Sequence, residues 1–148
     1  MARKTKRWTS LPSKAKTTNG EKVAVPLESD LQKQLIEWAG FVKYKNNYLD
    51  SYIHHSPNGG YRELFEAIKF RLMGVRAGYP DLIIDIAKGG YHGMRLELKR
   101  SPKEKVSNNQ VLALQLLSEE GYYVTTACSL DEATLKIERY IDSKEIRQ

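Results

Sequence analysis

The order of hydrophobic patterns along the chain predicts an α/β fold, in which a small mixed β-sheet is flanked by helices. Apolar residues recur at helical spacing in four segments, and apolar and polar residues alternate as in paired strands over residues 81–99. Glycines that suit helix ends separate several of these segments. With 148 residues, 41% of them hydrophobic, the chain is large enough for one domain with a buried core.

In the first half of the chain we expect a helix after Pro26, then a short strand over 52–55, a turn over 56–60 and a second helix from about 61 to 73. Gly40 and Gly74 would end the two helices. The apolar positions of the first helix are Leu27, Leu31, Leu35 and Trp38, and those of the second are Leu64, Phe65, Ile68 and Leu72.

The second half begins with a hairpin of strands, which a helix, a strand over 122–128 and a last helix follow. Ser107 and Gln110 have capping-box spacing at the start of the first of these helices, and Ser129 and Glu132 repeat that spacing at the start of the last one. The apolar positions of the first of these helices are Val111, Leu114 and Leu117, and in the last helix Leu135 and the segment from Ile137 to Ile141 would supply the apolar contacts.

The register of the hairpin follows from its apolar residues, because side chains alternate between the two faces of a strand. Matching the apolar sets pairs Leu82 with Leu98, Ile84 with Leu96 and Ile86 with Met94, around a loop of Gly89, Gly90 and Tyr91.

That register predicts Asp81 opposite Lys99 and diagonal to Glu97, all on the face away from the leucines. Two carboxylates at that separation can bind one hard cation such as Mg²⁺, and a lysine beside them can polarise water or offset phosphate charge. The alternative is the solvated polar face of an antiparallel sheet.

Four motifs occur in order along the chain: His55-Ser-Pro-Asn-Gly-Gly, Gly74-Val-Arg-Ala-Gly-Tyr-Pro-Asp81-Leu, Glu97-Leu-Lys99 and Ser107-Asn-Asn-Gln110. Pro80-Asp81 with Glu97-Leu98-Lys99 resembles the PD-(D/E)xK nuclease signature, and the longer pattern resembles a stand-alone VRR-NUC domain over about 27–141. Val75-Arg76-Ala77 departs from the Val-Arg-Arg of the family name, which puts a role of the second arginine in doubt.

The resemblance implies a restriction-endonuclease-like core and a DNA endonuclease that uses Mg²⁺ or Mn²⁺ and leaves a 5′-phosphate. Asp81, Glu97 and the Leu98 carbonyl would bind the metal, with Lys99 beside the attacking water. The family also uses a glutamate from the first helix. Helical geometry favours Glu28 over Glu37, since Glu28 shares the face of Leu31 and Leu35, although Glu28 would also suit a helix N-terminus.

Other candidate residues carry weaker signals. By resemblance Gln110 lies near the active site as a further catalytic residue, yet its spacing from Ser107 also makes it a sufficient helix cap. Arg76 and Asn58 are candidates for nucleic-acid contact. Adjacent residues of a strand point to opposite faces, so we expect His54 and His55 to be structural and not catalytic.

Charge divides the chain into two parts. Residues 1–22 contain seven basic residues and one acidic residue, whereas the remainder has 17 of each. We therefore expect a flexible basic tail over 1–22 and a nuclease domain over 23–148. Lys4, Lys6 and Arg7 of the tail would contact phosphates, where they would raise affinity without reading sequence; a solubilising role is the alternative.

Neither a membrane span nor a signal peptide is expected, and the single cysteine, Cys128, fits a reducing compartment. The predicted location is therefore the cytoplasm, which for a phage protein would be the cytoplasm of the host cell. By resemblance the protein would be a homodimer that selects branched DNA such as a four-way junction, as in DNA repair. A non-catalytic nucleic-acid-binding protein that keeps the nuclease fold is the alternative function.

Overall fold

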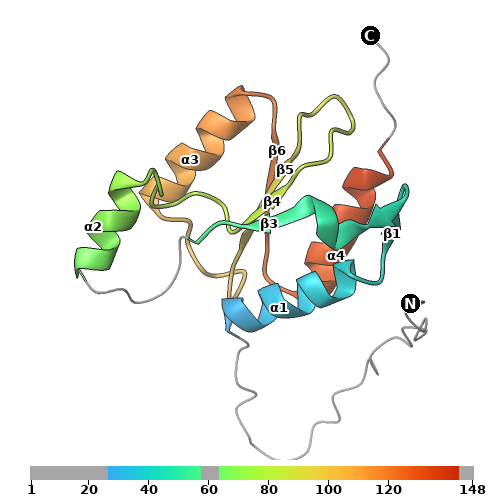
Figure 1. Cartoon of the computed structure of the whole chain (residues 1–148), viewed down its shortest axis with the longest axis horizontal. Coiled ribbons are helices and arrows are strands. Elements are labelled where there is room, and N and C mark those ends of the chain that lie inside the picture. The colour runs from blue at the N-terminus through green and yellow to red at the C-terminus, as the bar shows by residue number, and fades with distance from the viewer. Residues whose placement is uncertain (1–26, 58–63, 144–148) are drawn as a thin grey trace, which may run out of the picture.

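A computed structural model describes residues 27–57 and 64–143 of the chain. Four α-helices and two sheets make up this part, and their order confirms the predicted α/β fold (Figure 1). The elements are α1 (Glu28–Ala39), β1 (Lys43–Tyr44), β2 (Asn47–Tyr48), the 3-10 helix η1 (Leu49–Tyr52), β3 (Ile53–His55), α2 (Leu64–Leu72), β4 (Leu82–Ile84), β5 (Met94–Leu98), α3 (Asn108–Glu119), β6 (Tyr123–Ala127) and α4 (Leu130–Ile141).

The main sheet has the strand order β3-β4-β5-β6. Its first three strands are antiparallel, while β6 runs parallel to β5 after the crossover through α3, so the sheet is mixed as predicted. The small β1–β2 hairpin and η1, which follows it directly, were not predicted. They occupy the tyrosine-rich stretch between α1 and β3, where two-residue strands give too short a pattern to recognise.

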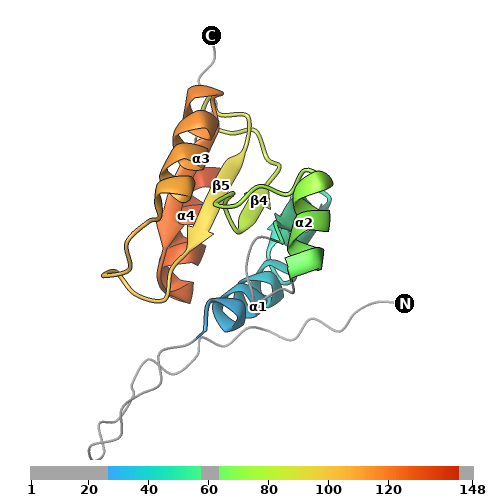
Figure 2. The ribbon, with the colours of Figure 1, turned by 90° about the vertical axis from the view of Figure 1, so that its left-hand side faces the viewer.

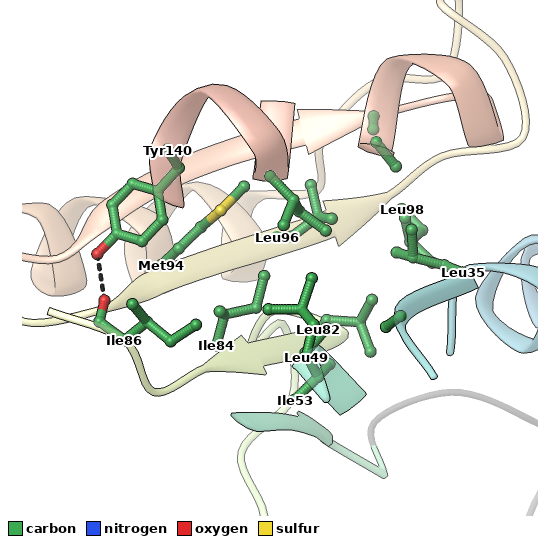
Figure 3. Packing of buried hydrophobic residues seen from close by; sticks show 14 of the residues in the cluster. Leu35, Leu49, Ile53, Leu82, Ile84, Ile86, Met94, Leu96, Leu98 and Tyr140 are labelled. Carbon is green, nitrogen blue, oxygen red and sulfur yellow. Dashed lines mark hydrogen bonds between the residues drawn. The ribbon is translucent and has the colours of Figure 1, made fainter. Parts of the chain in front are cut away.

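One face of the main sheet forms the core of the protein. Leu82, Ile84 and Leu96 are fully buried there with Leu35 of α1 (Figure 3). Ile137 of α4 belongs to the same cluster. The Tyr140 hydroxyl in the same cluster donates a hydrogen bond of 2.6 Å to the Ile86 carbonyl, which ties α4 to the segment after β4. The other face of the sheet therefore remains for α3 and for polar side chains.

The predicted hairpin register is wrong by two residues. Leu82 pairs with Leu96 and Ile84 with Met94, so each residue of β4 faces a partner two positions earlier than expected. The apolar residues still share the core face, because a shift of two positions preserves the alternation. The predicted assignment of residues to faces is thus confirmed although the pairs are not.

The hairpin loop explains the shift. Lys88 and Tyr91 form an isolated bridge around a two-residue turn, in which Gly89 and Gly90 have φ values of 58° and 84°. Glycine adopts such positive φ angles without strain, which allows a tighter turn than the predicted three-residue loop. The two arms of the loop differ in length, because three residues lie between β4 and the bridge and two lie between the bridge and β5. The strand register therefore cannot be obtained by counting outward from the turn.

Helices α2 and α3 lie on the same side of the molecule (Figures 1 and 2). The predicted helix 61–73 corresponds to α2, and residues 61–63 lie outside the described residues. No residue of α2 or α3 is fully buried. The apolar faces predicted for these helices exist, but α2 exposes its apolar face to solvent and α3 leaves Val111 exposed, with Leu114 and Leu117 half-buried.

None of the helices within 27–57 and 64–143 has the length and hydropathy that crossing a membrane requires.

Candidate active site

The polar face of the hairpin brings Asp81, Glu97 and Lys99 together. Asp81 immediately precedes β4, and its Oδ2 accepts a hydrogen bond of 2.8 Å from the backbone N–H of Leu98 on β5. The observed register, continued by one residue, places Asp81 across from Glu97, and not across from Lys99 as predicted. The two carboxylates therefore face each other more directly than expected.

Glu97 and Lys99 form a buried ion pair. The Lys99 Nζ lies 3.3 Å from the Glu97 Oε1, and these residues are only 6% and 3% exposed, respectively. Burial of a charged pair removes its hydration, and the free energy lost with the hydration must be offset by further hydrogen bonds. The environment of this pair differs from a solvated sheet face, which was the alternative interpretation of the alternating charges.

Gln110 supplies those further hydrogen bonds. Its Oε1 accepts from the Lys99 Nζ at 2.9 Å, and its Nε2 donates to the Glu97 Oε1. The same Oε1 accepts from the backbone N–H of Ser107 at 2.9 Å, and the Ser107 hydroxyl accepts from the Gln110 N–H, which completes a capping box. The two interpretations of Gln110 are thus compatible: it caps α3 and contacts both charged residues.

The loop before Asp81 is held close to the first turn of α3. Gly78 has a φ of +82°, and a Cβ at this position would lie 2.5 Å from the carbonyl carbon of Asn109. Only glycine permits both this backbone angle and this approach. Gly78 therefore lets the loop pass next to α3, whose Gln110 contacts the catalytic candidates.

Electrostatics disfavour the negative charge that these carboxylates carry together. Burial, and secondarily the neighbouring Asp81, raise the pKa of Glu97 to about 7. Burial also raises the pKa of Asp81, against the lowering effect of the hydrogen bond from Leu98. Burial first, and then Glu104 and Asp81, raise the pKa of Glu28. A bound cation would relieve this repulsion and favour the ionised forms.

Glu28 and Asp81 line one cavity of about 390 Å³. Glu28 opens α1, where a carboxylate suits the positive end of the helix dipole, and its Oε1 lies 4.0 Å from the Nε of Arg100. Glu37, the candidate that helical geometry disfavoured, is exposed. The structure thus brings Glu28 to the same site as Asp81, while its role as a metal ligand stays a prediction.

The donor set fits a hard divalent cation in its chemistry, since it consists of carboxylate oxygens and a backbone carbonyl. Among residues 27–57 and 64–143, no three His, Cys, Asp or Glu side chains converge closely enough to coordinate a metal. Their oxygens instead contact protein donors: Leu98 on Asp81, Lys99 and Gln110 on Glu97, and Arg100 on Glu28. Metal binding would require these side chains to rotate toward one another.

Two further residues at the site were not predicted from the sequence. His55 lines the cavity of Glu28 and Asp81, and its Nδ1 lies 3.2 Å from the Asp81 carbonyl oxygen, which can only accept. That contact requires a proton on Nδ1, so Nε2 can donate to a phosphate oxygen only when the imidazole ring is protonated. Arg100 lines the cavity as well. Two features of the sequence could have pointed to these residues: His55 begins one of the four motifs, and Arg100 directly follows Lys99.

The remaining predicted residues lie elsewhere. Arg76 donates a hydrogen bond of 3.3 Å to the Arg71 carbonyl and lines a separate cavity of about 450 Å³ between the end of α2 and the start of α3. The Leu98 N–H contacts Asp81, whereas metal binding by its carbonyl stays a prediction. Asn58, Lys4, Lys6 and Arg7 lie outside the described residues, as does the predicted tail 1–22.

Comparisons with known proteins agree with this fold. The family model of the VRR-NUC domain matches residues 19–130. A solved structure titled VRR_NUC domain protein is 38% identical, with a TM-score of 0.73, and the match covers 84% of this chain and 94% of that one. No curated protein matches the chain.

The family match and the α/β fold place the protein in the nuclease class. The chain belongs to the VRR-NUC domain family.

Proposed function

We propose that this protein is a divalent-metal-dependent DNA endonuclease that hydrolyses phosphodiester bonds. The observation that carries the proposal is the buried contact of Glu97, Lys99 and Gln110 next to Asp81, at the edge of a cavity that Glu28 also lines. A buried ion pair contributes little net stability. Carboxylates whose pKa is raised by burial and by one another are typical of functional sites.

In this proposal Asp81, Glu97, Glu28 and the Leu98 carbonyl hold Mg²⁺ or Mn²⁺. When bound, the cation would stabilise charge on the scissile phosphate and activate water for attack. Lys99 would orient that water by hydrogen bonding and offset negative charge at the phosphate. The product would carry a 5′-phosphate.

Gln110 would act as a positioning residue, because it holds the Lys99 ammonium and the Glu97 carboxylate at once. His55 and Arg100 would contact the DNA backbone from the walls of the cavity. Arg76, Asn58 and the basic residues of the tail, Lys4, Lys6 and Arg7, would bind phosphates further from the cleavage point, where charge raises affinity without reading sequence.

The preferred substrate in this proposal is branched DNA, such as a four-way junction, and the active form is a homodimer. A homodimer would have two active sites related by a two-fold axis, and these could act on two equivalent strands of a four-way junction.

The test is cleavage of labelled duplex, flap and four-way-junction DNA with Mg²⁺, with Mn²⁺ or with EDTA. We expect cleavage only with a divalent cation and fastest on branched DNA, and Glu97→Ala should abolish it while the variant still shifts DNA in a gel with Ca²⁺. Metal-independent cleavage, or binding without cleavage on every substrate, would contradict the proposal; the second outcome would indicate a non-catalytic DNA-binding protein.

A further inference from the structure

A cavity of about 450 Å³ lies between the end of α2 and the first turn of α3. Its volume falls in the range of about 300–1,000 Å³ that ligand pockets commonly have. Among the residues that the structure describes, none that lines the cavity is acidic. We call it the arginine cavity, and its walls include Phe70, Arg71, Val75, Arg76, Ala77 and Asn109.

The end of α2 gives the arginine cavity an apolar wall. The N–H of Val75 donates a hydrogen bond of 3.0 Å to the Phe70 carbonyl, and the N–H of Gly74 donates one of 3.1 Å to the Arg71 carbonyl. These are the two hydrogen bonds of a Schellman motif, in which the positive φ of Gly74 is typical. The motif commonly brings the side chains at the positions of Phe70 and Val75 together, and both residues are half-buried at the cavity wall.

Two arginines give the cavity positive charge. Arg76 donates a hydrogen bond of 3.3 Å to the Arg71 carbonyl, which holds its guanidinium at the end of α2. Arg71 lies in the last turn of the helix and is exposed. Within residues 27–57 and 64–143, no carboxylate forms an ion pair with either arginine. A ligand that suits this cavity therefore combines negative charge with an apolar surface.

The arginine cavity adjoins the proposed active site. Asn109 directly precedes Gln110, whose side chain contacts both members of the buried ion pair. On the other side of the cavity, Ala77 is four residues before Asp81, and four residues span at most about 14 Å. A ligand in the cavity would thus lie close to the phosphate that is cleaved.

We propose that the arginine cavity binds an unpaired nucleotide of the branched DNA substrate, with the base against Phe70 and the phosphate at Arg71 and Arg76. The inference rests on the proposed function and names the feature of the DNA that the protein selects. Bases stack on aromatic side chains whatever their sequence, which raises affinity roughly five- to 150-fold per base. The side-chain amide of Asn109 can both donate to and accept from the edge of that base.

The cost of opening a base pair explains why such a cavity would select branched DNA. A base inside a duplex has to be unpaired and unstacked before it can enter a protein cavity, and this cost is least for a base that is already unpaired. A flap or an opened junction supplies such a base at its branch point. Binding of that base would bring the adjoining phosphodiester to Asp81 and Glu97.

The test compares two flap DNAs that differ at the first unpaired nucleotide, which carries adenine in one and no base in the other. Fluorescence anisotropy with the full chain, with Ca²⁺ in place of Mg²⁺, measures binding and not cleavage. We expect wild type to bind the adenine flap at least about fivefold more tightly than the abasic flap, because only adenine can stack on Phe70. Phe70→Leu should bind the two flaps equally, since leucine is apolar but has no flat ring.

Two further variants make the comparison decisive. Phe65→Leu is the matched control, because Phe65 belongs to the same helix, is 84% exposed and is not among the residues that line the cavity; it should keep the wild-type preference. Ala77→Trp should lose the preference, because the indole would fill the cavity. Ala77 is exposed, so this variant should melt as wild type does, and it decides the question if Phe70→Leu fails to fold.

Equal affinity of wild type for the two flaps would overturn the proposal, as would an Ala77→Trp variant that keeps the preference for adenine. Loss of the preference in Phe65→Leu would also overturn it, because the base would then bind outside the cavity. The measurement does not depend on cleavage. A wild-type protein that prefers the adenine flap but does not cleave it in Mg²⁺ would contradict the proposed function and leave the assignment of the cavity standing.

Discussion

Replacing Glu97 by Gln should stabilise the metal-free protein at alkaline pH while it abolishes cleavage. Glu97 is buried, and its pKa is raised from 4.5 to about 7. The folded state therefore binds a proton more tightly than the unfolded state does. In the metal-free protein this carboxyl contributes full stability below about pH 4.5, and that contribution is lost as the pH rises toward 7.

The magnitude follows from that difference in pKa. At 1.36 kcal/mol per pKa unit, the ionised Glu97 lowers the free energy of unfolding at pH 8 by about 3 kcal/mol. Glutamine keeps an oxygen that can accept from Lys99 and Gln110 but removes the charge that neutralises Lys99. This loss offsets part of the 3 kcal/mol, and we expect the free energy of unfolding at pH 8 to rise by about 1–2 kcal/mol in total. For a chain of this size, that gain raises the melting temperature by about 2–8 °C.

The assay is thermal unfolding of wild type and Glu97→Gln in EDTA at pH 5 and pH 8. The variant should be more stable at pH 8 and close to wild type at pH 5, where Glu97 is largely protonated in the folded protein. Addition of Mg²⁺ or Mn²⁺ at pH 8 should stabilise wild type and not the variant, because ligands that bind only the folded state raise its stability. If Glu97→Gln is less stable than wild type at pH 8 in EDTA, the electrostatic reasoning is wrong.

Three further predictions concern the surroundings of the site. His55→Ala should slow cleavage at least about tenfold, because it loses one charge-assisted hydrogen bond. The control His54→Ala should cleave as wild type does, and equal rates for both variants would show that His55 does not belong to the site. Gly78→Ala should lower activity and the melting temperature together, because the Cβ would clash with α3, and an unchanged melting curve would refute that contact. Deletion of residues 1–22 should reduce the salt dependence of DNA binding by several units of log–log slope, measured by fluorescence anisotropy, since it removes seven basic residues; an unchanged slope would show that the tail does not touch phosphate.

Local pattern sufficed to predict most helices and strands and the faces of the central hairpin. Alternation with a period of two residues placed Leu82, Ile84 and Leu96 on the core face, and Glu97 on the other. The pairing of these residues depends on the loop, where Gly89 and Gly90 form a tight turn with arms of unequal length. Such irregularities leave no periodic signal, so the strand register could not be predicted from the sequence.

The composition of the site was easier to predict than its contacts. The resemblance to the family singled out Glu97, Lys99, Gln110 and a glutamate of the first helix, and helical geometry favoured Glu28 for that glutamate. The approach of His55 to the Asp81 carbonyl depends on pairing between β3 and β4, two strands that are distant in sequence. Likewise, the periodicity of α2 predicted an apolar face but could not show that this face is exposed within the described part of the chain, because burial depends on tertiary packing.

The central claim is that this buried cluster cleaves DNA with the help of a divalent cation. The most direct measurement is the rate of Mg²⁺-dependent cleavage of a four-way junction by wild type, Lys99→Ala and the control Lys43→Ala, whose lysine is exposed on β1. We predict that wild type and Lys43→Ala cleave at equal rates and that Lys99→Ala, folded and still able to bind DNA, does not cleave. Normal cleavage by Lys99→Ala would contradict the account.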